Sequence, residues 1–218
     1  MTKFVDDNFK KSTKRLIIRF YQESDFDSWK KCFTEMSPPK NYWDWKLSDK
    51  KLFSKSRFKQ KLEIHKKERE SDYIYYFALF EKKSGNLIGV SIIMDIIRGN
   101  FQTASLGVQL NNNFWGRGYG RESILALFNI AFKTLKLHRI ESLINPENTL
   151  SIKMVENLGM RKEGISKNRI KRGNKWGDMI IYAYTVEDLA DSVKLKKNGE
   201  HNFSGAKLFE LINTPAKK

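Results

Sequence analysis

The sequence predicts an α+β domain in which a mostly antiparallel sheet, with one parallel pair of strands, is flanked by helices. Two observations predict this fold class. β-Branched and aromatic runs separated by short turns dominate up to residue 110, and helical and strand patterns alternate after it. With 40% hydrophobic and 13% aromatic residues, the 218-residue chain has enough apolar material to bury a core.

The first elements are short. Leu16–Tyr21 (LIIRFY) is β-branched and aromatic and reads as a strand, and Ser24 or Asp25 is placed to cap the helix that follows it. An aromatic cluster, Tyr42, Trp43 and Trp45, comes next. Ser48–Glu70 is expected to form a charged helix with sparse apolar positions.

A meander of three strands should follow. The expected strands are Tyr73–Glu81, Leu87–Ile97 and Ala104–Leu110. Gly85 and Asn86 stand between the first two and supply a tight turn, so these two runs are expected to pair as an antiparallel hairpin.

The remaining elements alternate between helix and strand. Apolar residues recur at helical spacing over Arg121–Leu135, and Gly159 stands where a helix C-cap would be. The other expected elements are a strand at Arg139–Ile144, a helix at Leu150–Leu158, and a hairpin of Gly164–Ile170 with Met179–Thr185. Residues 1–189 are therefore assigned to the domain and 190–218 to a polar tail with one short helix at 206–212.

Composition narrows the setting in which the chain acts. No apolar run is long enough to cross a membrane, and no signal peptide precedes the first strand. One cysteine, Cys32, and three scattered histidines predict neither a disulfide nor a metal site, and favour a cytoplasmic location. The formal net charge is +16, which favours an anionic partner such as a nucleotide cofactor, RNA or an acidic protein.

The segment between the third strand and the long helix carries three alternating glycines, in Trp115-Gly116-Arg117-Gly118-Tyr119-Gly120-Arg121. Without Cβ atoms, such a backbone can turn its N–H groups toward an anion at the start of a helix. The segment lacks the Gly-Lys-Ser/Thr of a Walker loop and the spacing of a dinucleotide fingerprint. A pyrophosphate cradle for another cofactor and a plain glycine-rich turn both remain open on the pattern alone.

The same segment resembles motif A of the GNAT acetyltransferases. Further matching motifs occur in the same order: Ile97-Arg98-Gly99, Leu106-Gly107-Val108, Leu137-His138-Arg139-Ile140, Asn145 to Ser151, Leu158-Gly159-Met160, Glu163-Gly164 and Trp176-Gly177-Asp178. Together they are similar to the RimJ/RimL branch, the ribosomal-protein-alanine N-acetyltransferases, over roughly Arg15 to Leu189. The resemblance implies a GNAT-like sheet with a central, splayed parallel pair.

The resemblance also implies site residues. Cofactor contacts would fall on Trp115, Gly116, Arg117, Gly118, Tyr119, Gly120 and Arg121, with loop amides on the diphosphate of acetyl-CoA. The pantetheine arm would lie beside the strand ending at Leu110, and a backbone N–H near Val108 or Leu110 would polarise the thioester carbonyl. Asn148 and Ser151 would contact the pantetheine arm. Read from the residues alone, Asn148 could instead be only a helix cap and Ser151 only a first-turn hydroxyl.

The catalytic residues are less clear, because the chain departs from the wider family at two positions. Ser105 stands where relatives often carry Glu, and Val155 stands where many carry Tyr. Ser151 is therefore the candidate general acid, and the general base is not identified. His138 is interpreted as structural, His65 as solvated on a charged helix, and Cys32 as a semi-buried filler.

The resemblance implies a primary amine as acceptor, with the N-terminal α-amine of a ribosomal protein as the leading hypothesis. The basic charge would suit an encounter with a ribosome or its RNA. Three alternatives remain: a small-molecule amine such as an antibiotic or amino acid, a non-catalytic acetyl-CoA-binding protein, and an RNA-binding module. The segment expected to set acceptor specificity, Pro38–Glu70, is the part least similar to the family.

Overall fold

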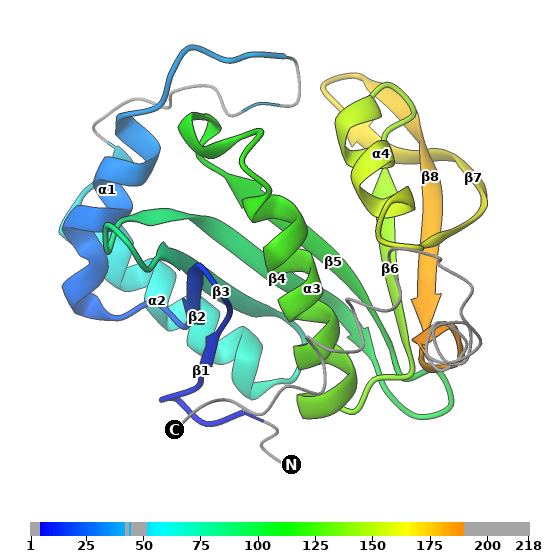
Figure 1. Cartoon of the computed structure of the whole chain (residues 1–218), viewed down its shortest axis with the longest axis horizontal. Helices are drawn as coiled ribbons and strands as arrows, with labels where there is room; N and C mark the ends of the chain where they lie inside the picture. Colours follow the sequence, from blue (N-terminus) through cyan, green and yellow to red (C-terminus); the bar gives the residue numbers. More distant parts are fainter. Residues whose placement is uncertain (1–4, 42–43, 45–51, 190–218) are drawn as a thin grey trace. The chain divides into compact units, whose positions relative to one another are not determined.

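The computed structural model describes residues 5–41, 44 and 52–189. The aromatic cluster at 42, 43 and 45, the start of the predicted helix at 48, and the tail at 190–218 lie outside these residues, so the predicted division at residue 189 stays a prediction. Within the described part, eight strands form one sheet in the order β1-β2-β3-β4-β5-β6-β8-β7 (Figure 1). The elements are β1 (Lys10–Ser12), β2 (Leu16–Arg19), α1 (Phe26–Thr34), α2 (Lys55–Glu70), β3 (Tyr75–Glu81), β4 (Leu87–Ile97), β5 (Thr103–Leu110), α3 (Tyr119–Asn129), β6 (Arg139–Ile144), α4 (Thr149–Glu156), β7 (Arg161–Arg172) and β8 (Lys175–Thr185).

The chain divides into two compact units. The first holds the described residues up to Met94 together with Gly107–Leu127, and the second holds Asp95–Leu106 and the described residues from Phe128 onward. The first unit therefore contains β1 to β3, β4 up to Met94, the end of β5, α1, α2 and most of α3. The second contains the last residues of β4 and of α3, the start of β5, all of β6 to β8, and α4.

An aromatic core in the first unit attaches α1 and α2 to the sheet. Trp29 of α1 lies 4.9 Å from Phe58 of α2 between ring centroids. Both rings are buried and pack in one cluster with Ala78 of β3 and Val90 of β4. Burying large rings of this kind contributes about 1.5–3 kcal/mol each, which is enough to offset the weak amphipathicity of the charged α2.

Gly89 of β4 sets how closely β5 approaches its neighbour. A Cβ atom built at this position would lie 2.2 Å from the carbonyl oxygen of Gln109 and 2.9 Å from the Cα of Leu110. Both atoms are backbone, so no side-chain rearrangement could relieve the contact. The end of β5 can therefore keep its position only while residue 89 has no side chain.

In the second unit, the sheet contains the parallel pair that the sequence predicts. β5 pairs with β6 through Thr103–Arg139, Ala104–Ile140 and Ser105–Glu141. β6 pairs antiparallel with β8, and β8 with β7. The sheet is otherwise mostly antiparallel and helices flank it, which confirms the predicted fold class.

Several boundaries differ from the prediction. The helix predicted from residue 121 begins two residues earlier, at Tyr119, and after Asn129 continues as a π-helical turn, Ile130–Thr134. The last hairpin is longer than predicted, because Gly173 and Asn174 alone form its turn. Lys171 and Lys175 lie between the predicted strands, yet they belong to β7 and β8. β1 was not predicted, since its three polar residues carry no apolar alternation.

Candidate functional site

The glycine-rich segment joins β5 to α3 in the first unit. A 3-10 turn, Asn112–Phe114, follows β5, and the indole N–H of Trp115 donates to the carbonyl of Leu110 at 3.0 Å. Gly116 and Gly118 have φ angles of +74° and +78°, in the left-handed region that residues with a Cβ rarely adopt. The local sequence therefore turns the chain sharply into α3 because two of its residues are glycine.

The N–H groups of this turn are available to a ligand. Among the described residues, those from Gly116 through Arg121 donate to no protein oxygen, and the first helical bond of α3 runs from Glu122 N–H to the carbonyl of Gly118. Gly118 has no side chain that could cap these amides. Consecutive unpaired amides at a helix N-terminus form a site that favours an anion.

Glu122, in the first turn of α3, holds the turn in place. Its carboxylate accepts hydrogen bonds from the Thr13 hydroxyl, from the backbone N–H of Arg15 at 2.8 Å, and from the Arg15 Nε at 2.7 Å. Burial alone would raise the pKa of Glu122, but the hydrogen bonds from Thr13 and Arg15 outweigh it and hold the pKa below its ordinary value. The start of α3 is thereby attached to the segment that precedes β2.

Arg15 and Tyr119 complete the surroundings of the turn. The Arg15 Nη1 donates to the carbonyl of Arg117 at 2.8 Å, and its guanidinium lies 4.4 Å from the centroid of the Tyr119 ring. The Tyr119 hydroxyl donates to the carboxylate of Glu81 at the end of β3. Hydrogen bonds from Ser84 and Tyr119 lower the pKa of Glu81. The turn is thus fixed by contacts to the segment that precedes β2 and to the end of β3.

The amides predicted to polarise the thioester belong to the end of β5. Asn111 N–H donates to the carbonyl of Ile88 on β4 at 2.9 Å. Successive N–H groups of an extended strand point to opposite edges, so the N–H groups of Leu110 and Val108 face away from β4. They are therefore directed away from the neighbour that holds this end of the strand.

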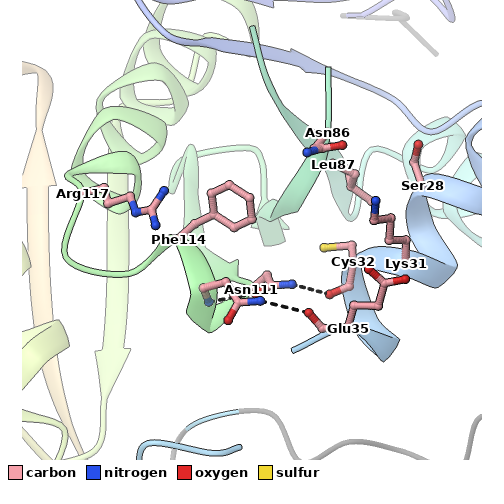
Figure 2. Close-up of a pocket in the computed structure, with 10 residues that line it drawn as sticks. Ser28, Lys31, Cys32, Glu35, Asn86, Leu87, Asn111, Phe114 and Arg117 are labelled. Carbon is pink, nitrogen blue, oxygen red and sulfur yellow. Dashed lines mark hydrogen bonds between the residues drawn. The ribbon is translucent and has the colours of Figure 1, made fainter. Parts of the chain in front are cut away.

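A pocket of about 240 Å³ lies beside the turn in the first unit, between α1, the start of β4 and the segment after β5 (Figure 2). Its wall is held by two amides: the Asn111 side chain donates to the carbonyl of Cys32, and the Asn113 side chain donates to the carbonyl of Glu35. The lining residues are Ser28, Lys31, Cys32, Glu35, Asn86, Leu87, Asn111, Asn113, Phe114 and Arg117.

Asn148 and Ser151 lie together at the start of α4, in the second unit. The Asn148 side-chain oxygen accepts the backbone N–H of Ser151 at 3.2 Å, so Asn148 is the N-cap of α4. The hydroxyl of Ser151, on a half-buried residue, has no hydrogen-bond partner among the described residues. The capping interpretation of Asn148 is confirmed, while the hydroxyl of Ser151 is available for another partner.

The two described histidines, His65 and His138, differ in their surroundings. The interpretation of His65 as solvated was wrong: it is buried and stacks on Tyr76 at 3.8 Å, because α2 turns this face toward β3. Burial, together with Lys61 and Arg69, lowers the pKa of His65 to about 3. His138 is half-exposed and contacts Glu187.

Cys32 is fully buried rather than semi-buried. Burial raises the pKa of its thiol to about 12, so the sulfur behaves as an apolar group at neutral pH.

Thr13, Arg15 and Glu122 are the residues of this region that sequence reasoning missed. Arg15 and Glu122 are 107 positions apart, and a single sequence carries no signal that pairs them. The acidic residue in the first turn of a helix could have been noticed as favourable to the helix dipole, but its partner could not. Among the described residues, no group of three or more His, Cys, Asp or Glu could hold a metal ion, and no helix is long and apolar enough to cross a membrane.

The described residues thus form a mixed sheet with one parallel pair, and in the first unit a glycine turn presents unpaired amides at the start of α3. Residues 15–161 match the family model described as the acetyltransferase (GNAT) domain, and the chain belongs to this family. GNAT enzymes use acetyl-CoA, so the protein is an acetyltransferase.

Similar proteins agree with this family. The [ribosomal protein uS5]-alanine N-acetyltransferase of Escherichia coli (strain K12) is 26% identical over 179 residues, covering 81% of this chain and 91% of that protein. The probable N-acetyltransferase YjcK of Bacillus subtilis (strain 168) is 36% identical over 119 residues, which are 55% of this chain and 66% of that protein. Mycobacterium smegmatis RimJ, solved in complex with CoA-disulfide, superimposes with a TM-score of 0.68 at 21% identity, covering 85% and 90% of the two chains.

Proposed function

We propose that this acetyltransferase transfers the acetyl group of acetyl-CoA to the N-terminal α-amine of a ribosomal protein. The observation that carries the donor half of the proposal is the row of unpartnered amides from Gly116 to Arg121. They suit the diphosphate of CoA because they lie at a helix N-terminus and because Arg117 and Arg121, within the same segment, carry positive charge. The residues present therefore fit the donor.

The chain's own residues would bind and orient the donor in three places. Amides of the glycine turn bind the diphosphate, with Trp115 and Tyr119 fixing the two ends of the turn. The N–H of Val108 or Leu110, facing away from β4, donates to the thioester carbonyl, where negative charge develops during attack by the amine. Asn148 and Ser151 would contact the pantetheine arm from the start of α4.

Ser151 is proposed to protonate the departing thiolate, directly or through a water molecule. Its hydroxyl makes no hydrogen bond to another described residue, so the group is not committed to holding the fold together. The thioester supplies an activated acetyl group, and the amine must arrive neutral. Positioning the amine against the carbonyl supplies much of the lowering of the barrier, so a single weak acid suffices on the protein side.

The acceptor class is inferred from similarity and charge. The E. coli relative is named for a ribosomal protein, and 81% of this chain aligns with it. A net charge of +16 suits an acceptor that is surrounded by RNA phosphates, and disfavours a polycationic amine as acceptor. A cytoplasmic location belongs to the same proposal, since ribosomal proteins are made and assembled there.

The test is a transfer assay with labelled acetyl-CoA. The full chain is incubated with ribosomal proteins of its own source, with the same proteins blocked at their N-termini, and with a panel of small amines. The proposal expects label on one free ribosomal-protein N-terminus and none on its blocked form. Label on small amines alone would identify a small-molecule enzyme, and binding of acetyl-CoA without transfer to any amine would contradict catalysis.

A further inference from the structure

The hairpin formed by the end of β7 and the start of β8 is an exposed basic segment that contains none of the proposed cofactor-binding residues. Residues 165–177 (ISKNRIKRGNKWG), called here the basic hairpin, hold five Lys or Arg residues and no Asp or Glu. β7 is the last strand in the order of the sheet, so one of its edges pairs with no described strand. Figure 1 shows the two strands of this hairpin in yellow and orange.

The side chains of the basic hairpin are largely in solvent. Trp176 is 59% exposed and Ile165 is 48% exposed. Lys171 lies opposite Trp176 in the register, so both side chains leave the same face of the ribbon. The next pair, Arg172 and Lys175, leaves the opposite face. Positive charge is therefore present on both faces, and an accessible indole lies on one of them.

The base of this segment is held in a defined shape. Asn168 has a φ angle of +49° where the pairing of β7 with β8 shifts register. Asp178 stabilises that bend, accepting the Asn168 N–H at 2.9 Å and the Lys167 Nζ at 2.7 Å. Because Asp178 lies just outside the basic hairpin, this arrangement orders the ribbon without placing a carboxylate within it.

Folding alone explains only part of this composition. Lysines along an edge strand prevent unwanted pairing with another strand, which accounts for Lys171 on β7. It does not account for Trp176, because β8 is an inner strand and this indole gains little burial there. A second copy of the chain is disfavoured as the binding partner of the basic hairpin, since two such segments would bring like charges together. A membrane surface requires an apolar face separate from the charged one, and the Lys171–Trp176 and Arg172–Lys175 pairs leave no face uncharged.

We infer that the basic hairpin binds unpaired RNA, with its cations on the phosphates and a base stacked on Trp176. Cations that follow a backbone, combined with an aromatic platform, are the recurring means of holding a single strand. The inference rests on the proposed function for its choice of RNA, because a ribosomal-protein acceptor lies among RNA. The basic hairpin would then bring the enzyme to the particle that carries its acceptor.

The experiment measures binding of the full chain to a fluorescently labelled, unstructured RNA of about 12 nucleotides, by anisotropy and without acetyl-CoA. Trp176→Ala is expected to weaken binding about tenfold, and Trp176→Phe to restore most of the loss. Lys171→Gln with Lys175→Gln is expected to reduce the slope of log Kd against log salt by about 1.4, since two phosphate contacts are lost. The matched control, Lys59→Gln with Lys67→Gln, removes the same charge from exposed positions of α2 and should leave the slope unchanged.

Three results would overturn the inference: equal affinity of Trp176→Ala and the unaltered chain, an equal effect of the α2 control, or Trp176-dependent binding to anionic vesicles in place of RNA. Unchanged melting temperatures establish that the variants fold. The two proposals can fail separately. Acetylation of a free ribosomal protein alongside hairpin variants that bind RNA normally would overturn only this inference, whereas hairpin-dependent RNA binding without transfer to any amine would overturn only the proposed function.

Discussion

The starts of α3 and α4 differ in how their backbone amides are satisfied. At α4, the chain itself supplies acceptors for two of the first three amides: Thr149 N–H donates to the carbonyl of Glu147, and Ser151 N–H to the Asn148 side chain. At α3, the preceding residue is Gly118, and the amides before Glu122 find no protein acceptor among the described residues. The start of α4 is therefore capped by its own chain, whereas the start of α3 has no cap from the described residues.

The difference shows where an anion site can be recognised. A helix N-terminus by itself says little, because most are capped by a side chain, as α4 is. The start of α3 stands apart because a glycine replaces the cap while Arg15 and Glu122 hold the surrounding chain in place. An uncapped helix start whose turn is fixed by other contacts is therefore better evidence for an anion site than the glycine pattern alone.

The largest effect is expected when a carboxylate is placed at the uncapped start. Gly118→Asp should weaken CoA binding by about a hundredfold, because one added charge about 5 Å from a diphosphate costs about 3 kcal/mol at an effective dielectric constant near 20. Isothermal titration with CoA measures this. Gly118→Asn keeps the shape without the charge, and Gly85→Asp adds the same residue at another left-handed position with no neighbour within 4 Å. Equal losses in Gly118→Asp and Gly118→Asn would show that the amides do not bind an anion.

A smaller effect is expected when the hydrogen bonds that Glu122 accepts from Thr13 and Arg15 are weakened. Glu122→Gln replaces the acceptor of charge-assisted hydrogen bonds from Thr13 and Arg15, and should destabilise the fold by roughly 1–3 kcal/mol at neutral pH. Thermal unfolding reports the loss.

The pH dependence of that loss has a definite sign. Because the pKa of Glu122 is lowered in the folded state from an ordinary value of 4.5, the advantage of the unaltered chain is fully present above about pH 4.5. It disappears as the pH falls through the folded-state pKa. A stability difference that stayed constant down to the acid range would contradict the ionised role of Glu122.

Substitution of Ser151 tests whether the start of α4 supplies a general acid for the reaction. If its hydroxyl protonates the leaving thiolate, Ser151→Ala should lower kcat about 10- to 100-fold and leave the affinity for acetyl-CoA nearly unchanged. Ser151→Cys retains a proton donor and should recover part of the rate. Steady-state kinetics on a peptide with a free N-terminus separates the two effects, and an unchanged kcat in Ser151→Ala would remove the residue from the mechanism.

The smallest effect is expected at the cap itself. Asn148→Ala should cost about 1 kcal/mol of stability, and Asn148→Asp should keep that stability because its oxygen can still accept the Ser151 N–H. CoA titration of the Asp variant then isolates any direct contact with the donor. Weakened binding despite a preserved melting temperature would show that Asn148 does more than cap α4.

Truncation tests the predicted domain limit. Removing residues 190–218 should leave CoA binding intact, since the segment similar to the family ends before it. A truncated chain that folds but no longer binds CoA would show that the limit was set wrongly.

Most strands and helices could be predicted from local sequence patterns. Leu16–Tyr21, Leu87–Ile97 and Arg139–Ile144 were predicted as strands because alternation and β-branching are written within each segment. Gly159 was predicted as a C-cap, but α4 ends at Glu156 with Asn157 as its C-cap; Gly159, with a φ angle of +84°, lies in the left-handed turn that follows.

What the sequence could not supply is contact between distant segments. The apolar periodicity predicts a helix only from Arg121, whereas α3 begins at Tyr119 and includes Gly120 in its first turn. The attachment of Glu122 to Thr13 and Arg15, and the burial of His65 against Tyr76, depend on which segments fold together. A single sequence does not encode that pairing in any local pattern.

Gly89 has a consequence for how this protein can vary. Every missense change reachable from a glycine codon by one nucleotide introduces a Cβ, and at this position that atom would overlap the main chain of Gln109. Neutral drift at residue 89 is therefore closed off, even to alanine. Any variant with a side chain at residue 89 would have to displace the end of β5, which carries Val108 and Leu110. Under the proposed function, such a displacement would change the affinity for acetyl-CoA.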